Sequence, residues 1–194
     1  MNRRRYVHIA IGVLLLAVLA WGVNRGLERL VAPPATTTSG AGAAATPPAV
    51  PHITATLFYA ATDGQALIPV QREVPLAEGV VPQGREILLM QLQAAPSPYL
   101  SAIPAGTTLR AFYVTERGDA FVDLSGEVSS KHPGGSFTEL LTVYAIVNAV
   151  TANLPTIQRV QILIDGKEAE TLAGHIDLRR PLIRDVTLVR ESET

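Results

Sequence analysis

The sequence contains no cysteine, which excludes disulfide bonds, thiolate metal sites, a cysteine nucleophile and a lipid-modified cysteine. Aromatic residues are also scarce, at 5% of the 194 residues, whereas 47% of the residues are hydrophobic. This composition is sufficient for the hydrophobic core of one folded domain. A core of that size does not need disulfides, so export from the cytoplasm is compatible with the sequence.

Clusters of positive charge are missing from most of the chain. Five of the 16 Lys and Arg residues precede Pro34, where Glu28 is the only acidic residue. From His52 onward acidic residues outnumber basic ones, and no group of Lys or Arg residues is suited to a phosphate backbone. The sequence therefore predicts that the protein does not bind nucleic acid.

The first 30 residues have the pattern of a membrane-targeting segment. Three arginines at positions 3–5 precede an apolar run that begins at Val7 and ends at Val23. As a helix this run would be roughly 25 Å long, at the short end of the range for a bilayer. We expect an uncleaved single-pass anchor in the cytoplasmic membrane, with the N-terminus inside and the C-terminal domain extracytoplasmic, periplasmic or on the outer face. The alternative is a cleaved signal peptide, for which Val18 and Ala20 suit the peptidase site.

Composition and periodicity divide the chain into three parts. Residues 1–30 form the cytoplasmic tip and anchor, residues 31–51 form a flexible Ala/Thr/Pro linker, and residues 52–190 form the folded domain. Strands are predicted at 53–60, 67–74, 108–115, 120–124, 157–164 and 167–172, with helices at 85–95 and 136–154. Pro69 would place the second strand at an edge or a bulge. The expected fold class is α/β (α+β), with a mixed, mainly antiparallel sheet and two helices on one face, preceded by an N-terminal transmembrane helix.

The long helix is the central element of the predicted domain. Ser136 and Glu139 have the spacing of a capping box, so we expect Glu139 to cap its own helix. Its apolar residues cover more than one face, and the stripe of Val143, Ile146 and Val150 needs a cover besides the sheet. We expect the helix at 85–95 to provide that cover and the stripe to be core; the alternative is that the stripe is an interface.

Catalytic and metal-binding motifs are weak. The G-H-x-D sequence of His175 and Asp177 could hold a metal or a catalytic dyad, but we expect a structural turn with His175 bonded to backbone, because His52 and His132 are predicted to lie elsewhere. The serines do not lie in a nucleophile motif. Gly134 and Gly135 precede a helix and could hold an anion, although they lack the lysine and spacing of a P-loop. We therefore expect no catalytic residue, no cofactor and no metal.

Several motifs together resemble the GerMN domain family of bacterial sporulation and spore germination proteins: VDLS, GGSFTELLTVYAIVNAV, VQILIDGK and TLAGHIDLRRP, with LFYA and IPAGTTL before them. The resemblance implies an extracytoplasmic α/β domain of bacterial membrane proteins, with no catalytic residues to carry over. The chain differs from many members in having one copy and no lipobox cysteine. The positions that match the family signature, for which we expect structural roles, are Asp123, Ser125, Gly135, Ser136, Glu139, Asn148, Asp165, Gly166, Gly174 and His175.

Two classes of function remain open from the sequence. The first is a membrane-anchored module for protein interaction or assembly in the bacterial cell envelope, which binds another envelope protein or itself and is linked to sporulation or germination by its family. The alternative is a binding domain for a cell-wall or small envelope ligand. A groove lined by aromatic side chains would favour the ligand, whereas a flat apolar edge or helix face would favour the protein partner.

Overall fold

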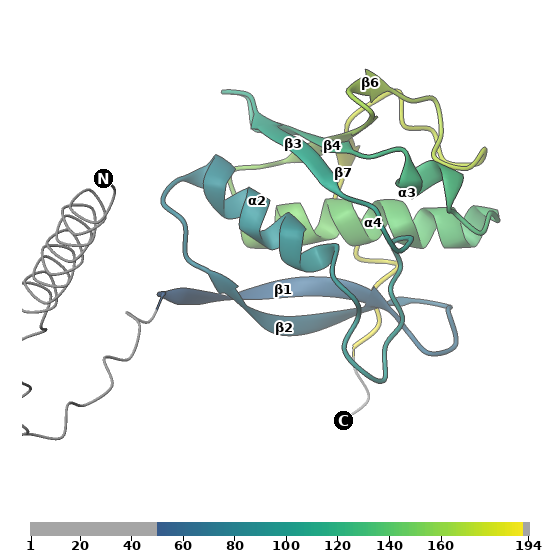
Figure 1. Ribbon diagram of the computed structural model, residues 1–194, viewed down its shortest axis with the longest axis horizontal. Coiled ribbons are helices and arrows are strands. Elements are labelled where there is room, and N and C mark those ends of the chain that lie inside the picture. The colour runs from purple at the N-terminus through teal and green to yellow at the C-terminus, as the bar shows by residue number, and fades with distance from the viewer. Residues whose placement is uncertain (1–49, 192–194) are drawn as a thin grey trace, which may run out of the picture. The chain divides into compact units, whose positions relative to one another are not determined.

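Two helices lie between two separate sheets in the computed structural model, which describes residues 50–191 (Figure 1). The smaller sheet, here called the β1–β2 ribbon, consists of β1 (His52–Ala60) and β2 (Leu67–Pro75). The larger sheet has the order β3 (Leu109–Val114), β4 (Asp119–Leu124), β5 (Arg159–Ile164) and β6 (Lys167–Glu168), and β7 (Leu182–Ile183) also pairs with β5. The domain is therefore α+β with mixed, mainly antiparallel strands, but the prediction of one sheet was wrong because there are two.

Two tight turns and one helical crossover join the strands of the larger sheet. β3 and β4 form an antiparallel hairpin, and β4 and β5 are parallel with α4 (Ser136–Asn153) as their crossover. The Asp165-Gly166 turn between β5 and β6 has φ angles of 52° and 76°. Both residues of a type I′ hairpin turn require positive φ, which Asp and Gly tolerate better than most residues.

Several elements differ from the predictions in their bounds. α2 spans Val80–Gln91 rather than 85–95, because Pro82 falls in the first turn, where a helix does not need the missing N–H. The prediction for Pro69 is confirmed, because β2 is an edge strand: Pro69 pairs with Phe58, whose N–H and C=O face away from β2. The strand predicted at 167–172 shrinks to β6, because Leu172 leaves the sheet and is buried in the core. A short helix, α3 (Glu127–Ser130), replaces part of the loop expected after β4.

The prediction that the stripe of Val143, Ile146 and Val150 on α4 belongs to the core is confirmed. Val143, Ile146 and Val150 are all fully buried. α4 packs along β1 on one side and against β5 on the other, and α2 lies beside it, in contact with β3 and the β1–β2 ribbon. Burying each large apolar side chain contributes roughly 1.5–3 kcal/mol before the loss of entropy is counted.

α2 also fixes the position of β3. Gly84 of α2 faces the Phe112 ring, and a Cβ atom at position 84 would overlap a carbon atom of that ring. The helix and the strand can therefore approach this closely only with glycine at position 84.

The predicted anchor and nearly all of the predicted linker lie outside the described residues. Within residues 50–191, no helix is both long enough and apolar enough to span a bilayer.

Candidate functional site

Glu139 is the most deeply buried charged residue of the family signature, with no exposed side-chain surface. Its Oε1 atom accepts the backbone N–H groups of Leu172 and Ala173 at 2.8 and 2.9 Å. Its Oε2 atom accepts the backbone N–H of His175 at 2.9 Å and lies 3.1 Å from the His175 Nδ1 atom. The carboxylate of α4 therefore holds the segment 172–175, 33 to 36 residues further along the chain.

The capping-box prediction was therefore wrong. Gly135 is the N-cap residue of α4, and no side chain caps this helix end. Burial raises the pKa of Glu139, but hydrogen bonds from the backbone of the 172–176 segment and from His175 together lower it more, so the net pKa lies below 4.5. Glu139 is thus held as a charged carboxylate whose oxygen atoms are occupied by backbone donors.

His175 and Asp177 do not form a dyad. His175 bonds the Glu139 carboxylate rather than a backbone group, whereas Asp177 bonds the backbone and guanidinium of Arg179. The Arg179 contacts lower the pKa of Asp177 to about 2. The two side chains therefore have separate partners. Gly174 precedes His175 in a turn closed by Thr171 Oγ1, which accepts the Gly174 N–H.

His132 lies closer to this cluster than the sequence suggested. Its pKa is therefore affected by the charges of Glu139, which raises it, and of His175, which lowers it. Burial is the main cause of a pKa below 6.5. Its Nδ1 atom accepts the Gly134 N–H, so Nε2 carries the proton and donates to Thr142 Oγ1 at 3.1 Å. In residues 50–191, no set of three His, Asp or Glu side chains has an arrangement that could hold a metal ion.

A second group of signature residues joins the ends of β4 and β5. Asp123 accepts the Gly166 N–H at 2.8 Å, and Asp165 accepts the Gly126 N–H at 3.2 Å. Arg110 of β3 lies between the two carboxylates, 3.3 Å from Asp123 and 3.4 Å from Asp165. Asp123 thus bonds the β5–β6 turn, and Asp165 bonds the loop that follows β4.

The remaining signature residues also contact backbone or end an element. Asn148 is fully buried, and its amide bonds both the C=O and the N–H of Asp185 at 2.7 and 3.1 Å. Ser125 Oγ accepts the Thr108 N–H at 3.0 Å beside the first pair of β3 and β4. Ser136 begins α4 on the surface. The structure thus places the ten residues in two separate clusters and at isolated contacts, not in one cleft.

The strand edges differ in whether their outward N–H and C=O groups are hydrogen-bonded. On β1, the Asn153 side chain bonds the N–H and C=O of Thr56, and the Gln91 side chain bonds those of Phe58. Leu100 then bonds those of Ala60 through its own backbone. These contacts cap the edge of β1 and explain why the other strands form a separate sheet.

The outer edge of β2 and the far edge of β5 also have few backbone groups available to pair with a further strand. β2 has Pro69 and Pro75, which lack an N–H, and its Leu67 is bonded by Leu188 and Arg190. Between the two prolines, only Gln71 and Glu73 direct both backbone groups outward. The far edge of β5 pairs with β6 at one end and with β7 at the other.

The outer edge of β3 has neither a cap nor a proline. Thr115 donates its N–H to Asp119, so by the antiparallel alternation Tyr113 exchanges bonds with Phe121, whereas Phe112 and Val114 direct their N–H and C=O away from β4. No side-chain or backbone group of residues 50–191 bonds these outward groups. The Tyr113 side chain, 59% exposed, lies at the centre of this edge.

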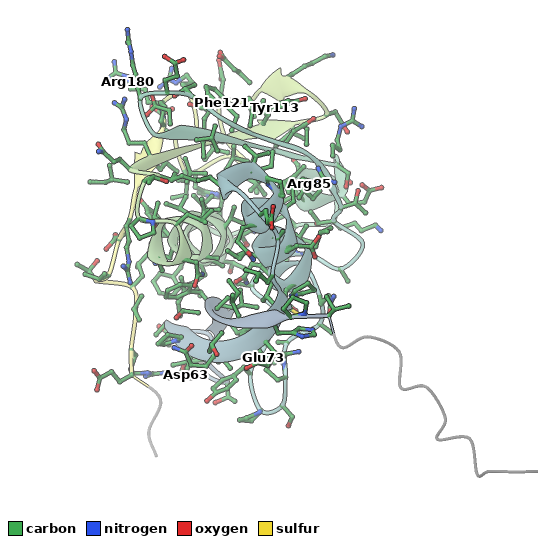
Figure 2. The ribbon with its side chains drawn as sticks, turned by 90° about the vertical axis from the view of Figure 1, so that its left-hand side faces the viewer. Asp63, Glu73, Arg85, Tyr113, Phe121 and Arg180 are labelled. Atoms are coloured by element: carbon green, nitrogen blue, oxygen red, sulfur yellow. The ribbon has the colours of Figure 1, made fainter. Side chains whose placement is uncertain are left out.

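Sequence reasoning missed this edge. Figure 2 shows Tyr113 and Phe121 next to each other on the side of the larger sheet away from the helices, with Arg85 of α2 on the opposite side. The strand itself was predicted. The signal for an exposed edge was the aromatic residue Tyr113, which alternates with the buried Phe112 and so lies on the opposite face of the strand.

A pocket of about 330 Å³ is a further candidate. It lies between the end of β1, residues 100–105 and the first turns of α4. Its lining is mostly apolar and contains no aromatic side chain, and it includes Ala60, Leu100, Ile103, Pro104 and Leu141.

These features define a small α+β domain with buried carboxylates that hold loops and an open sheet edge at β3. The family model Germane, sporulation and spore germination, matches residues 56–170, more than half of the chain, and the chain belongs to this family. The resemblance inferred from the sequence is confirmed. A search of curated proteins finds no match to the chain.

Solved structures of related proteins share the fold. A lipoprotein from Clostridium perfringens has 21% identity and a TM-score of 0.51, with coverage of 71% of this chain and 91% of that chain. The tandem GerMN domains of the sporulation protein GerM from Bacillus subtilis have 19% identity and a TM-score of 0.54, with coverage of 69% and 45%. The first GerMN domain of GerM alone also has 19% identity, with a TM-score of 0.51 and coverage of 69% and 96%. At these identities the likeness concerns the fold.

Proposed function

We propose that this protein is a non-enzymatic interaction module of the bacterial cell envelope that binds a protein partner through the outer edge of β3. The observation that carries the proposal is the contrast among strand edges: β1 is capped, β2 is interrupted by prolines, β5 is covered, and β3 is open. An open edge is a template for an added strand, and proteins normally block edges that have no partner.

The side-chain chemistry supports a binding role over catalysis. The carboxylates of Glu139 and Asp123 accept backbone N–H groups, and His132 has a bonding partner at each ring nitrogen. A general base needs an oxygen or nitrogen atom available to the substrate, and these atoms are already engaged inside the fold.

The N-terminal pattern supports a location in the envelope. Three arginines before an apolar run favour a single-pass anchor with the domain outside the cytoplasm. Two of the proteins with a similar fold are described as a lipoprotein and a sporulation protein, which agrees with a membrane-attached domain and a role in sporulation or germination.

The apolar pocket favours a second candidate function, the binding of a small envelope ligand. Its volume of about 330 Å³ lies at the lower end of the range for ligand sites. Thr138 and Ser101 are its only side chains with hydroxyl groups, and a glycan would need more polar partners and aromatic faces. The pocket therefore suits a small apolar group better than cell-wall glycan.

The proposal is tested by placing a photoreactive amino acid at Tyr113 of the full chain in living cells. Leu89 of α2, 40% exposed, is a matched control position. We expect a discrete protein adduct from position 113 and none from position 89. The adduct should disappear with Val114→Pro, which removes an outward N–H. Equal labelling at both positions, or an adduct that survives Val114→Pro, would contradict the assignment of this edge.

A further inference from the structure

We infer that the partner of the β3 edge is a second copy of this chain, with the two β3 strands antiparallel about a two-fold axis at Tyr113. This inference rests on the proposed function, because it uses the same edge, and it identifies the occupant. A two-fold axis perpendicular to a sheet necessarily makes the two edge strands antiparallel.

The backbone of β3 is self-complementary in this register. Phe112 and Val114 are the residues that direct N–H and C=O outward, and a two-fold axis at Tyr113 places Phe112 of each copy opposite Val114 of the other. Each such pair exchanges two hydrogen bonds, so all four outward groups of each strand become bonded. The two larger sheets would then form one continuous sheet.

The exposed side chains match in the same register. Tyr113 meets Tyr113 of the second copy as a non-hydrogen-bonded pair, the closer type of cross-strand neighbour. Because Tyr113 also pairs with Phe121 within each chain, a row of four aromatic rings would cross the interface on the outer face. Such cross-strand aromatic pairs stabilise sheets.

The aromatic pair and the nearby charges favour this register over its neighbours. It brings Arg110 of one copy near Glu116 of the other, just beyond the two ends of the regular edge. The Arg110 side chain is half-exposed and also contacts Asp123 and Asp165 of its own chain. If one strand slid by two residues along the other, in either direction, Arg110 would lie opposite Val114 or Gly118 instead. Such a shift would also place Tyr113 opposite Ala111 or Thr115, so both the charge pair and the aromatic pair would be lost.

Pairing of this kind stops at two copies. The β-bulge between Leu109 and Ala111 ends the regular edge on one side, and the turn after Thr115 ends it on the other. The dimer thus uses the open edge of both copies and leaves no β3 edge for a third.

The absence of cysteine makes a direct test possible in the full chain. Tyr113→Cys introduces a single thiol at the two-fold axis, where the Cα separation of a non-hydrogen-bonded pair falls within the range for a disulfide. With mild oxidant we expect a disulfide-linked dimer on a non-reducing gel. Leu89→Cys should remain monomeric under the same conditions. Ala111→Cys should cross-link with Thr115→Cys in a mixture but not with itself.

A charge variant distinguishes a loss of dimerisation from a loss of folding. Glu116 lies in an exposed turn, so Glu116→Arg should leave the thermal unfolding temperature unchanged and reduce the cross-linked fraction of Tyr113→Cys severalfold. Cross-linking of Tyr113→Cys no greater than that of Leu89→Cys would overturn the second-copy inference. If position 113 still gave an adduct to a different protein that Val114→Pro abolishes, the proposed function would stand with another partner; absence of both would refute both.

Discussion

At the scale of single residues, the most informative group is the buried Glu139 carboxylate. Two oxygen atoms accept three backbone N–H groups and face the His175 ring. Desolvation opposes the charge, and the hydrogen bonds more than offset that cost. Glu139 therefore joins the start of α4 to the segment after β6. This contact explains why a charged residue is buried in the first turn of the helix.

Glu139→Gln should destabilise the domain without affecting the β3 edge. The amide NH₂ of Gln would face backbone donors in place of an acceptor oxygen, which strands at least one buried N–H. We expect a loss of about 1–3 kcal/mol in the free energy of unfolding, measured by urea denaturation. His175→Ala should cost less, because the His175 side chain is 44% exposed. A Gln variant as stable as the wild type would contradict this role.

Acidification should lower the stability in two windows. The pKa of His132 is below 6.5, so from that pH downward the unfolded chain binds a proton that the folded chain does not, and stability falls. The pKa of Glu139 is below 4.5, so its contribution is present above that pH and is lost as the pH falls through the folded value.

Asp63, Glu127 and Asp177 also have lowered pKa values and contribute to the acid window. The measurement is therefore the difference in melting temperature between wild type and Glu139→Gln from pH 7 to pH 3. We expect that difference to shrink below pH 4.5. A constant difference over the whole range would show that Glu139 is not charged in the fold.

At the scale of elements, side-chain amides replace strand pairing. Gln91 and Asn153, from two different helices, each bond the N–H and C=O of one residue of β1, as a neighbouring strand would. Asn148 does the same for Asp185. The helices therefore hold the β1–β2 ribbon by its edge, and they leave the larger sheet free to present β3.

Ile146→Asp should unfold the domain, because Ile146 is fully buried on α4 and an unpaired charge there has no partner. We expect a loss of more than about 3 kcal/mol. Phe137→Asp is a matched control on the same helix: Phe137 is 39% exposed and lies in the first turn, where an acidic side chain is favourable. Thermal unfolding followed by circular dichroism distinguishes the two, and an unchanged melting temperature for Ile146→Asp would contradict the core assignment.

The sequence predicted the elements better than their arrangement. The buried stripe of α4 and the Asp165-Gly166 hairpin follow from periodicity and turn chemistry, which are local. The split into two sheets depends on contacts between Gln91 or Asn153 and β1, which are separated by 33 and 97 residues. The partner of Glu139 lies 33 to 36 residues away, so the local capping-box pattern was a misleading signal. The open edge of β3 depends on what the other edges bond, which no local pattern reports.

At the scale of the whole molecule, the N-terminal pattern predicts which side of the membrane the domain occupies. An alkaline phosphatase fused after Thr194 should be active, because the enzyme needs export, and the fusion should stay in the membrane pellet after a carbonate wash. Changing Arg3, Arg4 and Arg5 to Glu is the control, because it should reduce or invert the orientation. A soluble, N-terminally trimmed product would instead support the signal-peptide alternative.

The open edge of β3 also has a consequence for the assembly of anchored chains. If the anchor holds the copies in one membrane, their motion is restricted to two dimensions, and the effective concentration of edges rises. A short edge with few hydrogen bonds can then form a dimer that would be weak in free solution.

The central claim is that the β3 edge is unbonded within one chain and is used between chains. Hydrogen–deuterium exchange of individual backbone amides in the full chain, followed by NMR over a range of protein concentrations, tests it directly. We predict that the amides of Phe112 and Val114 exchange rapidly at low concentration and become protected as concentration rises, while Tyr113, bonded to Phe121, stays protected throughout. Protection of Phe112 and Val114 equal to that of Tyr113 at the lowest concentration, or rapid exchange at every concentration, would contradict the claim.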